Sequence, residues 1–121
     1  VINNGRAGSK RGPEVFRRFI ANIGTVINPE INVDISNIKI YDHGDIDTTL
    51  SLYEAHNQLR LYVRFYLFNN KTVFVIGGSN DQSYSNAKGL MDYCFEKGET
   101  IDVVNIDAHL DVRPLKMGMA S

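Results

Sequence analysis

Three short runs of apolar, β-favouring residues, each followed by a polar cluster, constrain the fold of this chain more than any other feature. The runs are residues 38–41, 73–76 and 101–106. Strands without polar alternation, separated by helices, indicate a parallel sheet that is covered on both faces. The expected fold class is therefore α/β, with right-handed crossover connections between the strands.

Three other segments have the apolar periodicity of amphipathic helices. The first opens at Gly12 and Pro13, because proline at the first helical position gives up an amide that has no partner in any case, and it ends between residues 22 and 24. The second covers residues 48–68, with Thr48 or Thr49 as its cap. The third covers residues 83–97 and stops at Gly98. Residues 28–37 are expected to form a loop.

The composition is that of a globular domain without a strong electrostatic field. Of the 121 residues, 43% are hydrophobic and 10% are aromatic, which is enough to bury a core in one domain. The 13 basic and 14 acidic residues give a net charge of −1, which argues against a nucleic-acid partner. Arg17 belongs to a basic group near the start of the chain. We interpret this group as a solvated helix face or loop, with an anion contact as the alternative.

The cysteine content and the absence of long apolar runs predict a cytoplasmic protein. The single cysteine, Cys94, rules out an internal disulfide, suits a reducing compartment and has the helical spacing of a buried core thiol. No apolar run approaches the roughly 20 residues of a membrane span, and nothing resembles a signal peptide. The chain also lacks an initiating methionine and ends without a terminating element, so we expect it to be part of a larger domain.

Each apolar run leads into a polar cluster. The clusters are DHGD at 42–45, GGSND at 77–81 and DAHLD at 107–111. In open α/β sheets, ligands bind beyond the carboxyl ends of the strands, where the loops converge. Three clusters on one edge predict a common site.

The last cluster has side chains that suit a metal ion. Asp107, His109 and Asp111 lie two positions apart, which puts them in register on a strand. A fully extended strand would hold Asp107 and Asp111 about 13 Å apart, at ~3.3 Å per residue, so the backbone must bend near residues 108–110 for both to hold metal. Carboxylate and imidazole groups without a thiolate favour Mn²⁺ over a structural zinc. Alternatively, the two aspartates are turn or capping residues and His109 only packs.

The remaining polar residues indicate a binding site less strongly. Gly77 and Gly78 could cradle a phosphate, but the segment lacks the lysine of a P-loop and the third glycine of a dinucleotide fingerprint. The DHGD cluster is as well suited to bracing its loop as to binding a ligand. His56 is most simply a partly exposed surface or packing residue.

Four motifs in this order resemble the arginase/agmatinase/formimidoylglutamase superfamily, the ureohydrolases. They are NNGRAG at 3–8 with Gly12 and Pro13 after it, DHGD at 42–45, the paired glycines at 77–78, and DAHLD at 107–111. The extension DVRP at 111–114 is most similar to the formimidoylglutamase branch. The motifs spread over almost the whole chain and are together far more specific than any one of them.

The resemblance implies a three-layer α/β/α fold with a mainly parallel sheet, of which residues 1–121 form the N-terminal part. It also implies a binuclear manganese centre and hydrolysis of a C–N bond in a guanidino or formimino group by metal-bound hydroxide. Carried over by position, Asp107 bridges both ions, His109 binds one ion and Asp111 binds the other. Arg113 is placed to hold the carboxylate of a small-molecule substrate, because arginine binds carboxylates in a bidentate manner.

Two departures from the family pattern affect this expectation. The family has a histidine ligand shortly after the paired glycines, where this chain has Asn80. Because an amide oxygen is neutral and a poorer Mn²⁺ ligand than imidazole, one metal position is expected to be weakened. The second acidic motif of the family, S-x-D-x-D, is absent from the 121 residues. We therefore expect this segment alone to be inactive.

These observations leave open more than one function. The first hypothesis is a metal-dependent amidine hydrolase, close to formimidoylglutamase, assembled as a trimer or hexamer as is usual in the family. The alternative, suggested by Asn80, is a catalytically inactive arginase-like protein that serves as a binding or regulatory subunit. A flavodoxin-like phosphate or receiver domain shares the parallel sheet but needs different loop chemistry.

Overall fold

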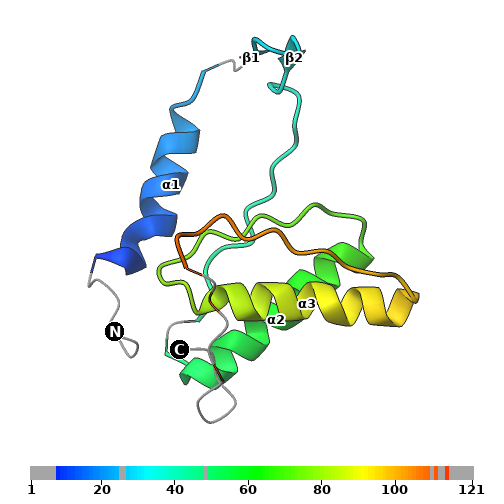
Figure 1. The fold of residues 1–121 in the computed structure, drawn as a ribbon. Coiled ribbons are helices and arrows are strands. Elements are labelled where there is room, and N and C mark those ends of the chain that lie inside the picture. Colours follow the sequence, from blue (N-terminus) through cyan, green and yellow to red (C-terminus); the bar gives the residue numbers. More distant parts are fainter. Residues whose placement is uncertain (1–7, 25–26, 48, 110, 112–113, 115–121) are drawn as a thin grey trace.

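The computed structural model describes residues 8–24, 27–47, 49–109, 111 and 114, and helices are its main elements (Figure 1). The order of elements along the chain is a short 3-10 helix η1 (Ser9–Arg11), α1 (Gly12–Ala21), β1 (Ile27–Asn28), β2 (Val33–Asp34), α2 (Leu52–Phe68) and α3 (Gln82–Lys97). Within this part of the chain, no helix combines the length and the apolar character that crossing a bilayer requires.

The predicted helices are confirmed, with one correction to a cap. Pro13 lies in the first turn of α1, and Gly98 ends α3 in the left-handed conformation at φ 69°, both as predicted. Helix α2 begins at Leu52, so the prediction of a cap at Thr48 or Thr49 is wrong. Ser51 is the cap, because its hydroxyl accepts the Glu54 amide at 3.3 Å while the Glu54 carboxylate accepts the Ser51 amide at 3.0 Å.

The small core lies between α2 and α3, which pack side by side (Figure 1). Val63 of α2 is 2% exposed and Cys94 of α3 is 6% exposed, which confirms the predicted core thiol. The helices approach closely at Gly89, where a Cβ atom would lie only 2.6 Å from the carbonyl oxygen of Arg60. A residue larger than glycine at position 89 would therefore force the two helices apart.

The three apolar runs do not form a sheet in the part of the chain that the structure describes. Residues 38–41, 73–76 and 101–106 run as segments outside any helix or strand (Figure 1). Several of their side chains are exposed, including Ile40 at 73%, Phe74 at 75% and Ile106 at 96%. A strand buried on both faces needs hydrogen-bonded neighbours and covering layers. Here the buried apolar side chains of the described residues, Val63 and Cys94, belong to α2 and α3.

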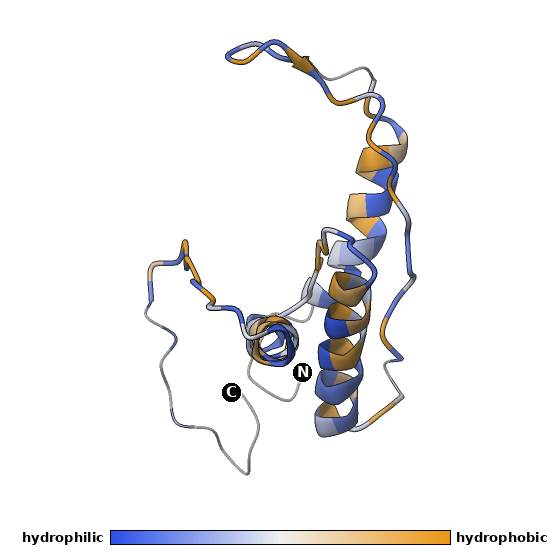
Figure 2. Cartoon of the chain, turned by 90° about the vertical axis from the view of Figure 1, so that its right-hand side faces the viewer, coloured by the Kyte–Doolittle hydropathy of each residue, from blue (hydrophilic) through white to orange (hydrophobic). Residues whose placement is uncertain are grey.

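A small hairpin replaces part of the loop predicted for residues 28–37. β1 and β2 pair antiparallel, with Ile27 opposite Asp34 and Asn28 opposite Val33. The carboxamide oxygen of Asn28 accepts the backbone amide of Glu30 at 2.9 Å, which stabilises the turn. The hairpin projects away from the α2–α3 pair, and hydrophobic residues occur both on it and on the segments outside the helices (Figure 2).

Candidate metal centre

Four of the five predicted site residues lie in described segments. Asn80 lies two residues before the start of α3, and Asp107, His109 and Asp111 follow the third apolar run. All four are exposed. The fifth, Arg113, lies outside the described residues.

Asp107 and His109 form one pair. The Asp107 carboxylate accepts the backbone amide of His109 at 2.7 Å, and the His109 ring nitrogen Nδ1 lies 3.0 Å from the same oxygen. These contacts, the backbone bond first, lower the pKa of Asp107 below its usual range. Residues 107–109 bend, as the metal hypothesis requires. The same geometry fits the alternative of an aspartate that stabilises a turn, and it leaves Nε2 of His109 as the outward nitrogen.

Asn80 and Asp111 form the second pair. Nδ2 of Asn80 donates to Oδ2 of Asp111 at 2.7 Å, although 31 positions separate them. The other end of the Asn80 amide, Oδ1, accepts the hydroxyl of Ser83 at 3.1 Å. Asp111 has a φ of 52°, in the left-handed region that aspartate tolerates better than most residues. The loops after the second and third apolar runs therefore meet, as predicted.

The side chains of these two pairs are of a type that binds manganese, but they do not lie close enough together to form a complete metal site. Carboxylate oxygens and an imidazole nitrogen are ligands that Mn²⁺ accepts. Across the described segments, however, no three His, Cys, Asp or Glu side chains come together closely enough to hold a metal ion. The structure thus brings the candidate ligands together as two pairs.

The DHGD cluster braces α1. Arg17 contacts Asp42 through Nε at 2.6 Å and Nη2 at 3.1 Å, and its Nη1 lies 2.9 Å from Asp45. The Arg17 contact and the Gly44 backbone amide lower the pKa of Asp42 to about 2, and the same contacts raise the pKa of Arg17. The bracing interpretation of this cluster is the one the structure supports. Nothing in the sequence links Arg17 to carboxylates 25 or more positions away.

His43, within the same cluster, is held by aromatic side chains. Its Nδ1 lies 2.6 Å from the hydroxyl of Tyr66, and its ring centroid is 4.1 Å from that of Tyr62. Both tyrosines belong to α2, so His43 ties the loop to this helix.

The paired glycines pass close to the N-terminal segment. A Cβ atom on Gly78 would lie 3.2 Å from the carbonyl oxygen of Ser9, and one on Gly12 would lie 3.2 Å from that of Gly77. The close approach of the two backbone segments is enough to explain why glycine occupies these positions. A bound phosphate is not needed to explain them.

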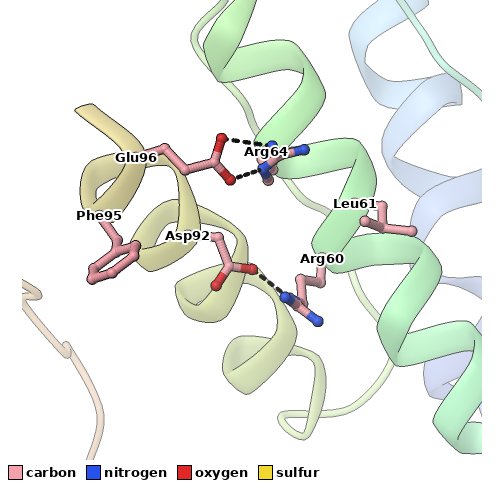
Figure 3. Close-up of a pocket in the computed structure, with 6 residues that line it drawn as sticks. All are labelled: Arg60, Leu61, Arg64, Asp92, Phe95 and Glu96. Atoms are coloured by element: carbon pink, nitrogen blue, oxygen red, sulfur yellow. Dashed lines mark hydrogen bonds and ion pairs between the residues drawn. The ribbon is translucent and has the colours of Figure 1, made fainter. Parts of the chain in front are cut away.

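Two surface hollows lie apart from the candidate ligands. A groove of about 300 Å³ crosses α2 and α3, where Arg64 binds Glu96 with two hydrogen bonds of 2.8 and 2.7 Å and Arg60 pairs with Asp92 (Figure 3). A second hollow of about 490 Å³ lies beside α1, with Phe16, Phe19 and Ile76 in its wall. No candidate metal ligand lines either hollow.

Comparison with known proteins identifies the class to which this fold and these motifs belong. The model of the Arginase family matches residues 2–120. The chain belongs to the arginase family.

Within that family, the chain is similar to formimidoylglutamases and falls in that branch. It is 31% identical over 122 residues to formimidoylglutamase of Clostridium tetani and 32% identical over 111 residues to that of Klebsiella pneumoniae. These alignments cover 98% and 92% of this chain. The chain spans about a third of the length of these relatives, 34% and 32% respectively.

Solved structures of Trypanosoma cruzi formiminoglutamase support the same branch. An asparagine-to-histidine variant with two Mn²⁺ ions matches with a TM-score of 0.80 and 44% identity, over 93% of this chain and 37% of the other. The oxidised protein, also with two Mn²⁺ ions, matches with a TM-score of 0.66 and 46% identity, over 75% of this chain and 31% of the other. The family therefore has a binuclear manganese cofactor, and the chain matches part of an α/β arginase fold.

Proposed function

We propose that the intact protein is a manganese-dependent hydrolase that cleaves a C–N bond in a linear amidine, with a formimino substrate of the formimidoylglutamase type. The observation that carries the proposal is the 2.7 Å hydrogen bond between Asn80 and Asp111. It joins the loops that follow two of the apolar runs, which is where an α/β sheet gathers its ligands. The similarity to formimidoylglutamases supports the reaction class.

The proposal assigns a role to each candidate residue. Asp107, His109 and Asp111 would hold manganese, with Asp107 serving both ions, His109 one of them and Asp111 the other, while Asn80 would be the weak position of the site. His109 would use Nε2, since Nδ1 faces Asp107 at 3.0 Å. Arg113 binds the carboxylate of the substrate. Manganese, when bound, supplies a Lewis acid that lowers the pKa of water toward neutrality.

The proposed site needs the sheet that the sequence predicts. In the intact domain, residues 38–41, 73–76 and 101–106 would pair as parallel strands between two helical layers. Closing the sheet would cover side chains such as Ile106, which is now 96% exposed, and draw the two pairs of candidate ligands toward one point. The cytoplasmic location and the homo-oligomeric assembly as a trimer or hexamer stay predictions.

A product assay on the full-length protein tests the proposal. Water added across the formimino carbon, with cleavage of its bond to the substrate nitrogen, yields formamide and the free amine, whereas a guanidino substrate yields urea. With Mn²⁺ present, we expect formamide from N-formimino-L-glutamate and little urea from arginine or agmatine. An absence of turnover on all three substrates in a manganese-loaded protein would contradict the proposal. That result would favour the alternative hypothesis of an inactive binding subunit. The similarity to formimidoylglutamases argues against this alternative.

A further inference from the structure

A partly buried pair of a histidine and an aspartate connects α2 to the loop of the candidate metal centre. Nε2 of His56 lies 2.7 Å from Oδ2 of Asp81. The two side chains are only 12% and 9% exposed, which makes this the most buried contact between a histidine, lysine or arginine and a carboxylate in the described segments. Because a carboxylate has no hydrogen to give, the ring nitrogen is the donor. Placing two polar groups here has a desolvation cost that a surface pair avoids.

Asp81 uses its carboxylate for this pair and not for capping. It occupies the N-cap position of α3, where aspartate commonly accepts a backbone amide of the first turn, yet its side chain makes no such bond. Its second oxygen, Oδ1, accepts the hydroxyl of Ser79. Both carboxylate oxygens are therefore occupied, which fixes the orientation of Asp81 and of the loop before α3.

Helix docking alone does not explain the pair. Arg60 with Asp92 and Arg64 with Glu96 already link α2 to α3 further along the two helices, where Val63 and Cys94 form the core. His56 differs from these two arginines because its partner, Asp81, is the neighbour of the candidate ligand Asn80 in the chain. The amide of Asn80 in turn reaches Asp111 at 2.7 Å.

We propose that His56 and Asp81 are positioning residues of the metal centre, with His56 fixing the loop that holds Asn80 against Asp111. This inference rests on the proposed function, since it needs manganese to bind at these residues. Outer partners that orient metal ligands typically change metal affinity by about 10 to 100-fold when they are removed. His56 would act two steps away from the ion, through Asp81 and Asn80.

Manganese titrations of the full-length apoprotein, followed by the electron paramagnetic resonance signal of free Mn²⁺, test this role. We expect His56→Leu to raise the dissociation constant of the weaker site about tenfold. His56→Gln, whose amide nitrogen can replace Nε2 as a donor, should recover most of the affinity. Arg64→Gln is the matched control, because it breaks a link between the same two helices far from Asn80, and it should leave manganese affinity unchanged.

Thermal unfolding of the same apoproteins separates positioning from simple structural support. If His56→Leu lowers the melting temperature as Arg64→Gln does but binds manganese like the wild type, the inference is wrong. Should His56→Leu fail to fold, Asp81→Asn preserves the shape of the loop and must weaken manganese binding for the inference to stand. A wild-type protein that binds no manganese overturns the proposed function and this inference together. Failure of the inference alone leaves wild-type binding intact.

Discussion

Asn80 donates a hydrogen bond from Nδ2 to Oδ2 of Asp111 over 2.7 Å, although 31 positions separate the two residues. The amide thus meets the carboxylate through its nitrogen, while its oxygen accepts the hydroxyl of Ser83. An asparagine in this arrangement orients Asp111 well and is a poor metal ligand, because its oxygen is neutral and already bonded.

Replacing Asn80 with histidine should strengthen manganese binding. We expect Asn80→His to lower the dissociation constant of the weaker site by about tenfold, which corresponds to about 1.4 kcal/mol, because imidazole is the better ligand. Manganese titration of the full-length protein measures this. Asn86→His places the same imidazole on an exposed position of α3 and should have no effect. Equal affinities for wild type and Asn80→His would show that Asn80 lies outside the metal centre.

The contact between Arg17 and Asp42 should stabilise the protein only above acidic pH. The pKa of Asp42 falls from 3.8 to about 2 in the folded state, so its contribution is fully present above pH 3.8 and is lost as the pH falls through about 2. Arg17→Gln should therefore lower the melting temperature at neutral pH, with a difference from wild type that shrinks in this acidic window.

Thermal unfolding of the full-length protein across this pH range provides the measurement. Arg18→Gln is the control, since Arg18 pairs with Glu14 on the surface of the same helix and such pairs contribute little. A stability loss in Arg17→Gln that stays constant down to about pH 2 would contradict the assigned cause.

Gly89 should be intolerant of even one added methyl group. Its Cβ position lies 2.6 Å from the carbonyl oxygen of Arg60 and 2.8 Å from Cβ of Val63, so Gly89→Ala forces α2 and α3 apart. We expect a loss of about 1–3 kcal/mol in unfolding free energy, as is typical of overpacking. Urea denaturation measures the change. Asn86→Ala, on the exposed side of α3, should change stability by about 0.5 kcal/mol or less, and an equal loss in both variants would contradict the close approach.

The 121-residue polypeptide alone should not turn over an amidine substrate. It has the two pairs Asp107 with His109 and Asn80 with Asp111, and the described residues hold no group of three metal-binding side chains. A two-ion site needs more ligands than these. Incubation of the polypeptide with Mn²⁺ and N-formimino-L-glutamate, followed by formamide detection, tests this. Measurable turnover would contradict the prediction.

The helices could be predicted from the sequence because their signals are local. Apolar periodicity is read within a few turns, and Pro13 at the start of α1 and Gly98 at the end of α3 indicate the correct boundaries there. The local sequence does not decide between Thr48, Thr49 and Ser51 as the cap of α2, because threonine and serine are both good caps. Only the reciprocal bonds between Ser51 and Glu54 distinguish them.

The sheet and the supporting contacts depend on partners far away in the chain. Whether residues 101–106 pair as a strand depends on neighbours and covering layers, not on their own β propensity. Similarly, His56 has no sequence signal for its bond to Asp81, 25 positions away. The sequence predicts that the loops after the apolar runs converge on one edge, and Asn80 meets Asp111 as expected, although these runs do not pair as strands in the described residues.

The manganese content of the full-length protein, with and without Asp107, tests the central claim most directly. After loading and removal of free metal, elemental analysis should find close to two manganese ions per chain in the wild type, as in the Trypanosoma cruzi formiminoglutamase structures. Asp107→Asn, which removes the charge of the proposed bridging ligand while keeping its shape, should retain less than one. A wild type without manganese, or an Asp107→Asn variant that keeps both ions, would contradict the account.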